Sequence, residues 1–229
     1  MITYFEMRPP DSQSLMADGS KQVTGTKAEF EVTSCPITTE HIAGKRRISQ
    51  LFLQVNHDRR DEMIWSWAPN GYVIHERLLF EFEKQGFSGF QTKPAVVRFR
   101  DGFTSSEYRE FIVTGWAGMA SPESGIRIIE ECPACHRKKY SPVSNPEKLI
   151  DWDQWTGDDF FVMWPRPLFS LITERVAQWL LQNKVKSFRL GSIQDISPVV
   201  ARFGFSPGRL SDYIPKDLAK LYGSGLGIV

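Results

Sequence analysis

The sequence lacks several features that define large classes of protein. It has 3 cysteines among 229 residues, and this small odd number does not build the disulfide framework of a secreted domain. No stretch approaches about 18 consecutive apolar residues, and the opening residues show no basic segment followed by an apolar run. We therefore expect a cytoplasmic protein without a membrane span, whose cysteines are reduced and free to bind metal.

The sequence also lacks an excess of charge of either sign. Lysine and arginine total 28 against 27 for aspartate and glutamate, which leaves a formal net charge of +1. So small a net charge creates no long-range field that would draw the whole protein to nucleic acid or to an anionic membrane. Any charged partner must therefore be met by a local patch of side chains.

Motifs that carry common catalytic chemistry are missing as well. The sequence has no glycine-rich phosphate loop, no Gly-x-Ser-x-Gly elbow and no His-Glu-x-x-His helix. Cys135 and His136 are adjacent, but neighbours on an extended strand point to opposite faces, which is the wrong geometry for proton transfer. Glu76 and Glu174 each precede an arginine at an expected helix start, where a carboxylate suits the helix dipole. We therefore expect a protein without catalytic activity.

The sequence does contain a partial self-repeat. The motif SCPIT around Cys35 recurs as ECPAC around Cys132, 97 positions later. The same offset carries Trp67 onto Trp164. Several anchors in one order at nearly one offset indicate an ancient duplication.

Two longer segments continue the repeat and predict its helices. Residues 73–90 (VIHERLLFEFEKQGFSGF) align with residues 171–188 (LITERVAQWLLQNKVKSF) after a one-residue insertion, so that Phe90 falls on Phe188. In both segments apolar residues recur at helical spacing, and the second segment follows Ser170, a candidate N-cap. Each helix is expected to lead into a strand.

Strand-forming runs occur along the whole chain between turn residues. These runs are ITYF, AEFEVT, ISQLFLQV, AVVRF, EFIVTGW, GIRII and DFFVMW. A last helix is expected in PKDLAKLYG, opened by Pro215 and closed by Gly223. Together the patterns predict an α+β fold of two similar halves, residues 1–117 and 118–229, each with strands, one main amphipathic helix and one Cys-Pro knuckle like that of a zinc ribbon.

The chain has one intact metal-ligand spacing, Cys132-x-x-Cys135. A two-cysteine knuckle supplies half of a tetrahedral zinc site, so the other half must come from elsewhere. In the aligned first copy Cys35 is present, but Thr38 stands where the second cysteine would be. The repeat therefore predicts a zinc site with three thiolates and one further ligand.

We expect His41 to be the fourth ligand, because it follows Cys35 by six residues on the same segment. His136 is adjacent to Cys135 and is expected to point away from the metal. The alternative is that the three cysteines are small buried hydrophobic residues or idle thiols in a fold that once held zinc.

The paired Cys-Pro elements and two longer stretches resemble a known family. The stretches are IVTGWAGMASPESGIRIIEECPACHRKKYS (residues 112–141) and DDFFVMWPRPLFSLITERV (residues 158–176). They look like the double-CXXCG family of myxobacterial paralogues and related bacterial proteins, over a region from about Phe30 to about Phe205. The chain departs from the family pattern at Thr38, where a cysteine is missing, and at His136, where the family has glycine.

The resemblance implies a cytoplasmic immunity protein that protects its cell from a cognate delivered toxin. Such a protein would act by covering the active site of the toxin or by locking it closed, so its essential residues would form an interface. The expected partner is therefore a toxin protein, and no membrane partner is expected.

A nucleic-acid-binding function is the alternative interpretation. Zinc ribbons often bind nucleic acid, and the basic clusters Lys45–Arg47 and His136–Lys139 follow the two Cys-Pro elements, so that they could converge in space. Against this interpretation stand the near-zero net charge and the lack of aromatic residues among those lysines and arginines.

A candidate partner surface lies in DWDQWTGDDFF, where aspartates surround two tryptophans. Tryptophan is enriched among interface hot spots, and nearby carboxylates would attract a basic partner. We therefore nominate Trp152, Trp155, Asp158 and Asp159 as partner-binding residues. The alternative is that both indoles pack into the core and that the aspartates cap turns.

Overall fold

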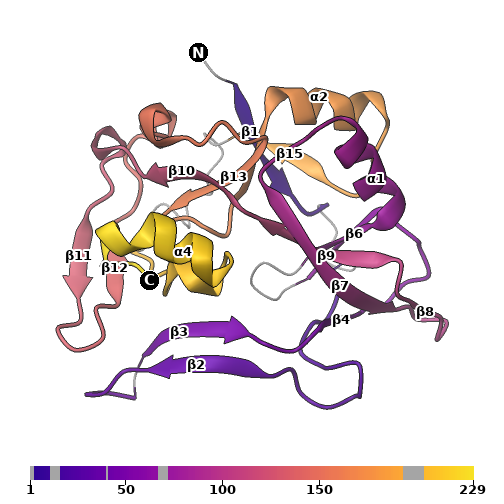
Figure 1. Cartoon of the computed structure of the whole chain (residues 1–229), viewed down its shortest axis with the longest axis horizontal. Coiled ribbons are helices and arrows are strands. Elements are labelled where there is room, and N and C mark those ends of the chain that lie inside the picture. Colours follow the sequence, from indigo (N-terminus) through magenta and orange to yellow (C-terminus); the bar gives the residue numbers. More distant parts are fainter. Residues whose placement is uncertain (1–2, 11–15, 40, 67–71, 193–203) are drawn as a thin grey trace.

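The computed structural model describes residues 3–10, 16–39, 41–66, 72–192 and 204–229 (Figure 1). The chain is a mixed α+β protein in which most of the regular structure is strand, as the sequence patterns predict. The described residues form two larger sheets, two separate two-stranded ribbons and three α-helices. None of these helices is long and apolar enough to span a bilayer.

The first larger sheet has the strand order β4-β7-β9-β6-β5, with β8 paired to β7. β4 and β7 run parallel, and the other neighbours in this sheet are antiparallel. Its strands are β4 (Leu51–Gln54), β5 (Met63–Trp65), β6 (Tyr72–His75), β7 (Phe90–Arg98), β8 (Thr104–Ser105) and β9 (Tyr108–Val113).

The second larger sheet has the order β10-β13-β14-β1-β15. Its strands are β1 (Tyr4–Arg8), β10 (Gly115–Met119), β13 (Phe160–Trp164), β14 (Ser170–Thr173) and β15 (Arg189–Gly191). The earliest described strand, β1, therefore lies among strands from the last half of the chain. The boundary that the sequence suggested after residue 117 falls inside β10.

The helices α1 (Glu76–Lys84) and α2 (Glu174–Gln182) lie side by side over the sheets (Figure 1). Phe82 of α1 and Trp179 of α2 touch edge to face, with ring centroids 5.7 Å apart. Their apolar faces enter the largest core cluster, which also contains Phe111 and Phe160 from the two sheets. A third helix, α4 (Lys216–Gly223), follows Pro215 as expected.

Both main helices begin later than the sequence pattern indicates. Residues 72–75 and 170–173 are the strands β6 and β14, and the N-cap of α2 is Thr173 instead of Ser170. The four residues before each helix are mostly buried and include β-branched side chains, which pack well between neighbouring strands. Sheet pairing therefore overrides the helical periodicity at these positions.

The two strand–helix units match one another in position and pairing. β6 with α1 and β14 with α2 have the same lengths at an offset of 98. Met63 pairs with Ile74 in the first sheet, and Phe160 pairs with Ile172 in the second. In the first sheet β9 lies between β6 and β7, and in the second β1 lies between β14 and β15. Trp67 lies outside the described residues, so its expected match to Trp164 is untested.

Two ribbons lie apart from the larger sheets. β2 (Phe30–Ser34) pairs with β3 (Ile42–Arg47), and β11 (Ile128–Glu131) pairs with β12 (Lys138–Tyr140). In Figure 1 their turn ends approach each other at the lower left. The Cys-Pro elements form these two turns.

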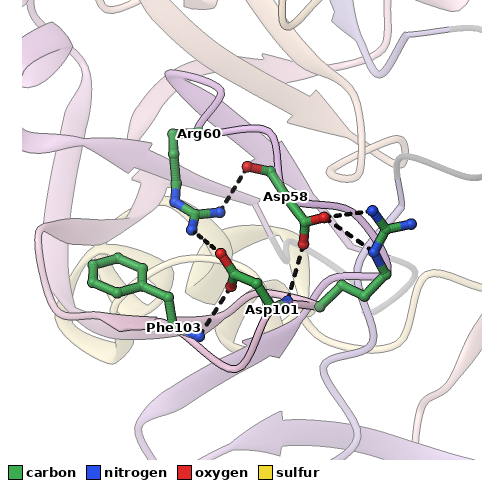
Figure 2. A network of polar contacts seen from close by, with 5 residues as sticks. Asp58, Arg60, Asp101 and Phe103 are labelled. Carbon is green, nitrogen blue, oxygen red and sulfur yellow. Dashed lines mark hydrogen bonds and ion pairs between the residues drawn. The ribbon is translucent and has the colours of Figure 1, made fainter.

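A polar network fixes the loop before β5 to the turn between β7 and β8 (Figure 2). Asp58 accepts hydrogen bonds from Arg100 Nε at 3.1 Å and from the backbone N–H of Asp101 at 2.9 Å. Arg60 donates to Asp101 at 2.6 Å, while its guanidinium stacks 3.8 Å from the ring centroid of Phe99. The network joins segments about 40 residues apart in sequence.

Candidate metal centre

The turns of the two ribbons bring four potential metal ligands together. Cys35 directly follows β2, and His41 directly precedes β3. Cys132 directly follows β11, and Cys135 lies in the turn before β12. The Sγ atoms of the three cysteines and one ring nitrogen of His41 all lie within 4.8 Å of one another. The proximity of Cys35, Cys132 and Cys135 predicted from the repeat is thus observed.

The distance between two of the sulfurs fits a tetrahedral site. Cys35 Sγ and Cys132 Sγ are 3.8 Å apart, and neither forms a disulfide. Two sulfurs bonded to one zinc ion at about 2.3 Å in tetrahedral geometry are separated by about 3.8 Å. His41 Nε2 is 3.0 Å from Cys135 Sγ, a separation at which imidazole and thiol share a hydrogen bond. Sulfur and nitrogen ligands of this kind are those that zinc prefers.

Two backbone hydrogen bonds close the second turn. The backbone N–H of His136 donates to the carbonyl of Cys132 at 2.9 Å, and the N–H of Cys132 donates to the carbonyl of Arg137 at 3.0 Å. This geometry places His136 at φ 57°, the left-handed region that glycine adopts most easily. The imidazole of His136 points away from the cluster, as expected, and its side chain is 71% exposed.

The local field favours one thiolate in the cluster. The backbone N–H groups of Cys135 and then Ala134 lie near the sulfur of Cys132 and lower its pKa to about 6. Burial raises the pKa of the Cys135 thiol. Because the thiolate is the form that binds metal, the lowered pKa of Cys132 favours metal binding by this sulfur.

The cluster is separate from the main hydrophobic cores. Cys35 and Cys135 are buried together with Ala43 in a small cluster of their own, against which Cys132 packs. Within the described ranges, this is the one group of at least three histidine, cysteine or acidic side chains with metal-ligand spacing. The ribbons therefore have little apolar packing of their own to hold their turns together.

The two nominated tryptophans are half-buried against a third core cluster. The rings of Trp152 and Trp155 touch at a centroid distance of 5.5 Å. Trp152 also contacts Tyr4 at 5.1 Å, and Trp155 contacts Phe161 at 5.7 Å. Both indoles thus pack largely against the chain itself.

The two nominated aspartates also serve local structure. Asp158 accepts a hydrogen bond from Thr156 Oγ1 at 2.5 Å. Asp159 is buried, accepts from Thr173 Oγ1 at 2.9 Å and forms an ion pair with Arg175 of α2. A carboxylate used in this way links the start of β13 to α2. These contacts favour the alternative in which the aspartates serve local structure, and partner binding by Asp159 stays a prediction.

The two basic clusters converge, and they do so beside the metal ligands. One groove of about 330 Å³ is lined by Lys45, Arg46 and Arg47 from the first cluster and by Arg137 from the second. Lys93 on β7 and the segment 206–215 complete its walls, and sequence reasoning missed both. No local motif marks them, because only the tertiary fold brings them to the ribbons.

Comparison of the chain with protein-family models and with curated proteins gives no match.

Proposed function

We propose that the chain binds one structural zinc ion through Cys35, His41, Cys132 and Cys135. The observation that carries this proposal is the convergence of all four ligand atoms within 4.8 Å. The ion would tie one ribbon to the other and supply folding energy that their small apolar cluster does not provide. All four sites are taken by the protein, which is the arrangement of structural zinc and not of catalytic zinc.

We infer that the two ribbons and the two strand–helix units descend from a duplication. The equal lengths of β6–α1 and β14–α2, and the equivalent pairings of Met63 with Ile74 and Phe160 with Ile172, support this inference. In this account each half contributed one knuckle to a shared site. His41 then took over the role of the thiol that is missing at Thr38.

We propose further that the protein is a non-catalytic immunity protein that neutralises a cognate toxin by occlusion in the cytoplasm. The proposal starts from the resemblance of the Cys-Pro elements and their flanking stretches to the double-CXXCG family. Exposed apolar side chains gathered on the ribbons add support, because such patches typically mark protein interfaces. They are Phe30, Val32, Ile37, Ile42, Ile128 and Ile129.

Elemental analysis of protein purified without chelator tests the zinc proposal. We expect one equivalent of zinc per chain, and we expect Cys132→Ser to lose it. The matched control is Ser144→Cys, which adds a thiol outside the cluster and should leave the zinc content unchanged. A metal-free wild-type protein that folds normally would contradict the proposal.

Growth protection tests the immunity proposal. The protein encoded beside this chain in its native host should be expressed in a susceptible strain with and without this chain. We expect the chain to restore growth and to co-purify with that protein. A chain that folds and binds zinc but gives no protection would count against the immunity function and leave the zinc site standing.

Nucleic-acid binding is the second candidate function, and the convergence of the two basic clusters on one groove favours it. Phosphate binding by those side chains must weaken steeply as salt concentration rises. Affinity for mixed DNA and RNA across a salt series therefore distinguishes this function from the first.

A further inference from the structure

The groove beside the metal ligands, here called the cationic groove, lies between β3, the β7–β9 pair and the segment 206–215. Its cations come from three separate parts of the chain, Lys45–Arg47, Lys93 and Arg137. On a chain with a net charge of +1, this is a marked local concentration of positive charge. Such a concentration attracts anionic groups and orients them on approach.

The two carboxylates that line the groove are already used by the chain. Glu110 is buried and ion-paired with Arg47, and burial raises its pKa. Asp212 accepts the backbone N–H of Arg209 at 3.1 Å, and burial raises its pKa too. Two carboxylates thus face five cations in this groove, so they offset only part of its positive charge.

The fields of Glu110 and Asp212 reach Arg46, and that of Glu110 also reaches Lys93, but neither cation forms a direct ion pair with these carboxylates. Arg46, Lys93 and Arg137 form no ion pair within the described part of the chain, and each is at least partly exposed. The ammonium of Lys45 lies 4.4 Å from the ring centroid of Phe30, which leaves its charge unpaired. An anionic ligand with several charges would satisfy these groups together.

The rest of the lining indicates what kind of anion fits. Phe30, Ile42, Tyr213 and Ile214 also line the groove, and Phe30 and Ile42 are 38% and 47% exposed. A phosphate backbone gains little from aliphatic side chains, whereas a protein segment can bury them with apolar side chains of its own. Among the described residues β2 pairs with β3 alone, so its outer edge can also accept a strand.

We propose that the cationic groove is the docking site for an acidic segment of a partner protein. Carboxylates of that segment face Arg46, Lys93 and Arg137, while an apolar side chain packs against Phe30 and Ile42. This proposal rests on the proposed immunity function, because that function makes the toxin the partner protein. The groove would then be the surface that holds the toxin.

The Cys–His cluster fixes the relative positions of two residues that line the groove, Ile42 and Arg137. Ile42 directly follows the ligand His41, and Arg137 comes two residues after the ligand Cys135. Loss of the cluster would release both positions at once. We therefore expect binding of an acidic segment to weaken when the ligands are disrupted by Cys132→Ser.

Fluorescence anisotropy with the full chain tests the proposal. The probes are a short labelled peptide of alternating aspartate and leucine, its lysine–leucine counterpart and a labelled single-stranded oligonucleotide of mixed sequence. We expect the acidic peptide to bind more tightly than either other probe. The double variant Arg46→Glu with Arg137→Glu should weaken its binding about tenfold or more, because attraction becomes repulsion.

The matched control is Arg77→Glu with Lys186→Glu, which changes the net charge equally at two exposed positions outside the groove lining. It should change peptide affinity little, and both double variants should unfold at the same temperature as the wild type. Equal losses in the two variants would overturn the proposal, as would absence of peptide binding. Tighter binding of the oligonucleotide, lost steeply with salt, would also overturn it in favour of a phosphate-binding groove.

The growth assay separates this proposal from the immunity function. If the Arg46→Glu with Arg137→Glu variant still protects cells, the toxin is held elsewhere, and the proposed docking site is overturned while immunity stands. If the wild type binds the acidic peptide but gives no protection, the immunity function fails and the docking site stands.

Discussion

At the scale of single residues, His136 adopts a backbone conformation that its side chain disfavours. The position after Cys135 has φ 57°, and a side chain in the left-handed region costs about 1–2 kcal/mol relative to the ordinary helical region. The resemblance places glycine here, and glycine would adopt the same backbone without that cost. The turn is therefore held by its hydrogen bonds and by the cluster beside it.

Replacing His136 by glycine should therefore stabilise the protein. We expect His136→Gly to raise the free energy of unfolding by about 1 kcal/mol, with the strain relieved offset in part by the greater freedom of glycine in the unfolded chain. His136→Ala is the control, because alanine keeps the strain. Denaturant unfolding measures both, and a destabilised glycine variant would show that the imidazole itself supports the turn.

The pH dependence of the network in Figure 2 is a second prediction at this scale. The hydrogen bond from Arg60 holds the pKa of Asp101 below its ordinary value. A depressed acid pKa contributes stability that is present above the ordinary value and is lost as the pH falls through the depressed one. The melting temperature of Asp101→Asn should therefore fall below that of the wild type at neutral pH and approach it in strong acid.

The control for this pH series is Glu83→Gln, which removes an exposed carboxylate that forms no ion pair within the described residues. Its difference from the wild type should stay small at every pH. A gap between Asp101→Asn and the wild type that does not narrow in acid would contradict the role given to the Asp101 carboxylate.

At the scale of elements, the ribbons depend on the metal cluster more than the larger sheets do. The cysteines and Ala43 form a cluster separate from the cores under α1 and α2. Disrupting the metal site should therefore release the ribbons and leave most of the sheets folded. This differs from a small zinc finger, in which the metal ion organises the only core.

Hydrogen exchange with and without chelator measures this difference. We expect amides of β2–β3 and β11–β12 to lose protection when zinc is removed, while amides of β9 and β13 keep theirs. The control is Ser144→Cys, whose extra thiol lies outside the cluster. It should show the same protection as the wild type, with and without chelator. Equal loss of protection in the two ribbons and in β9 and β13 would mean that the ion stabilises the whole fold.

The sequence predicted elements where one local signal dominates. The amphipathic faces of α1 and α2 and the apolar run of β13 are examples, since their side chains all enter the core. It missed β3 and β12, which read IAGKRR and KKY, because lysine and arginine dominate both segments and no apolar alternation marks them as strands. Their backbone pairing depends on the neighbouring strand and leaves no apolar pattern.

The sequence predicted the four residues of the Cys–His cluster but not the groove beside it. The repeat identified the three cysteines, and proximity in sequence identified His41. The groove could not be found in this way, because Lys93 and Asp212 lie far from the knuckles in sequence. The local role of the acidic stretch could not be predicted either, because the ion pair between Asp159 and Arg175 depends on the position of α2 in the fold.

At the scale of the whole molecule, the two larger sheets meet at the carbonyl of Phe160. Added Cβ atoms at Gly89 and Gly115 would lie 2.0 and 2.3 Å from this oxygen. Gly89 also has φ +85°, and its carbonyl accepts the backbone N–H of Thr114 at 2.8 Å. The approach of the sheets therefore requires backbone without side chains at this junction.

Gly89→Ala should be strongly destabilising for that reason. We expect a loss of about 3 kcal/mol or more, because the backbone strain is joined by a clash with backbone that cannot move aside. Gly102→Ala is a matched control, since Gly102 has φ +87° but no atom within 4 Å of an added Cβ. Thermal unfolding of both variants measures the difference, and equal losses would mean that the junction adapts.

The place of β1 also has a consequence for the timing of folding. Tyr4 pairs with Thr173, and within the part of the chain that the structure describes β1 pairs with β14 and β15 alone. At synthesis rates of about 5–20 residues per second, β1 leaves the ribosome on the order of ten seconds before these partners exist. During that interval Met7, which ends up 3% exposed, has nothing to pack against. The second sheet can therefore close only after the residues of β15, Arg189–Gly191, have been synthesised.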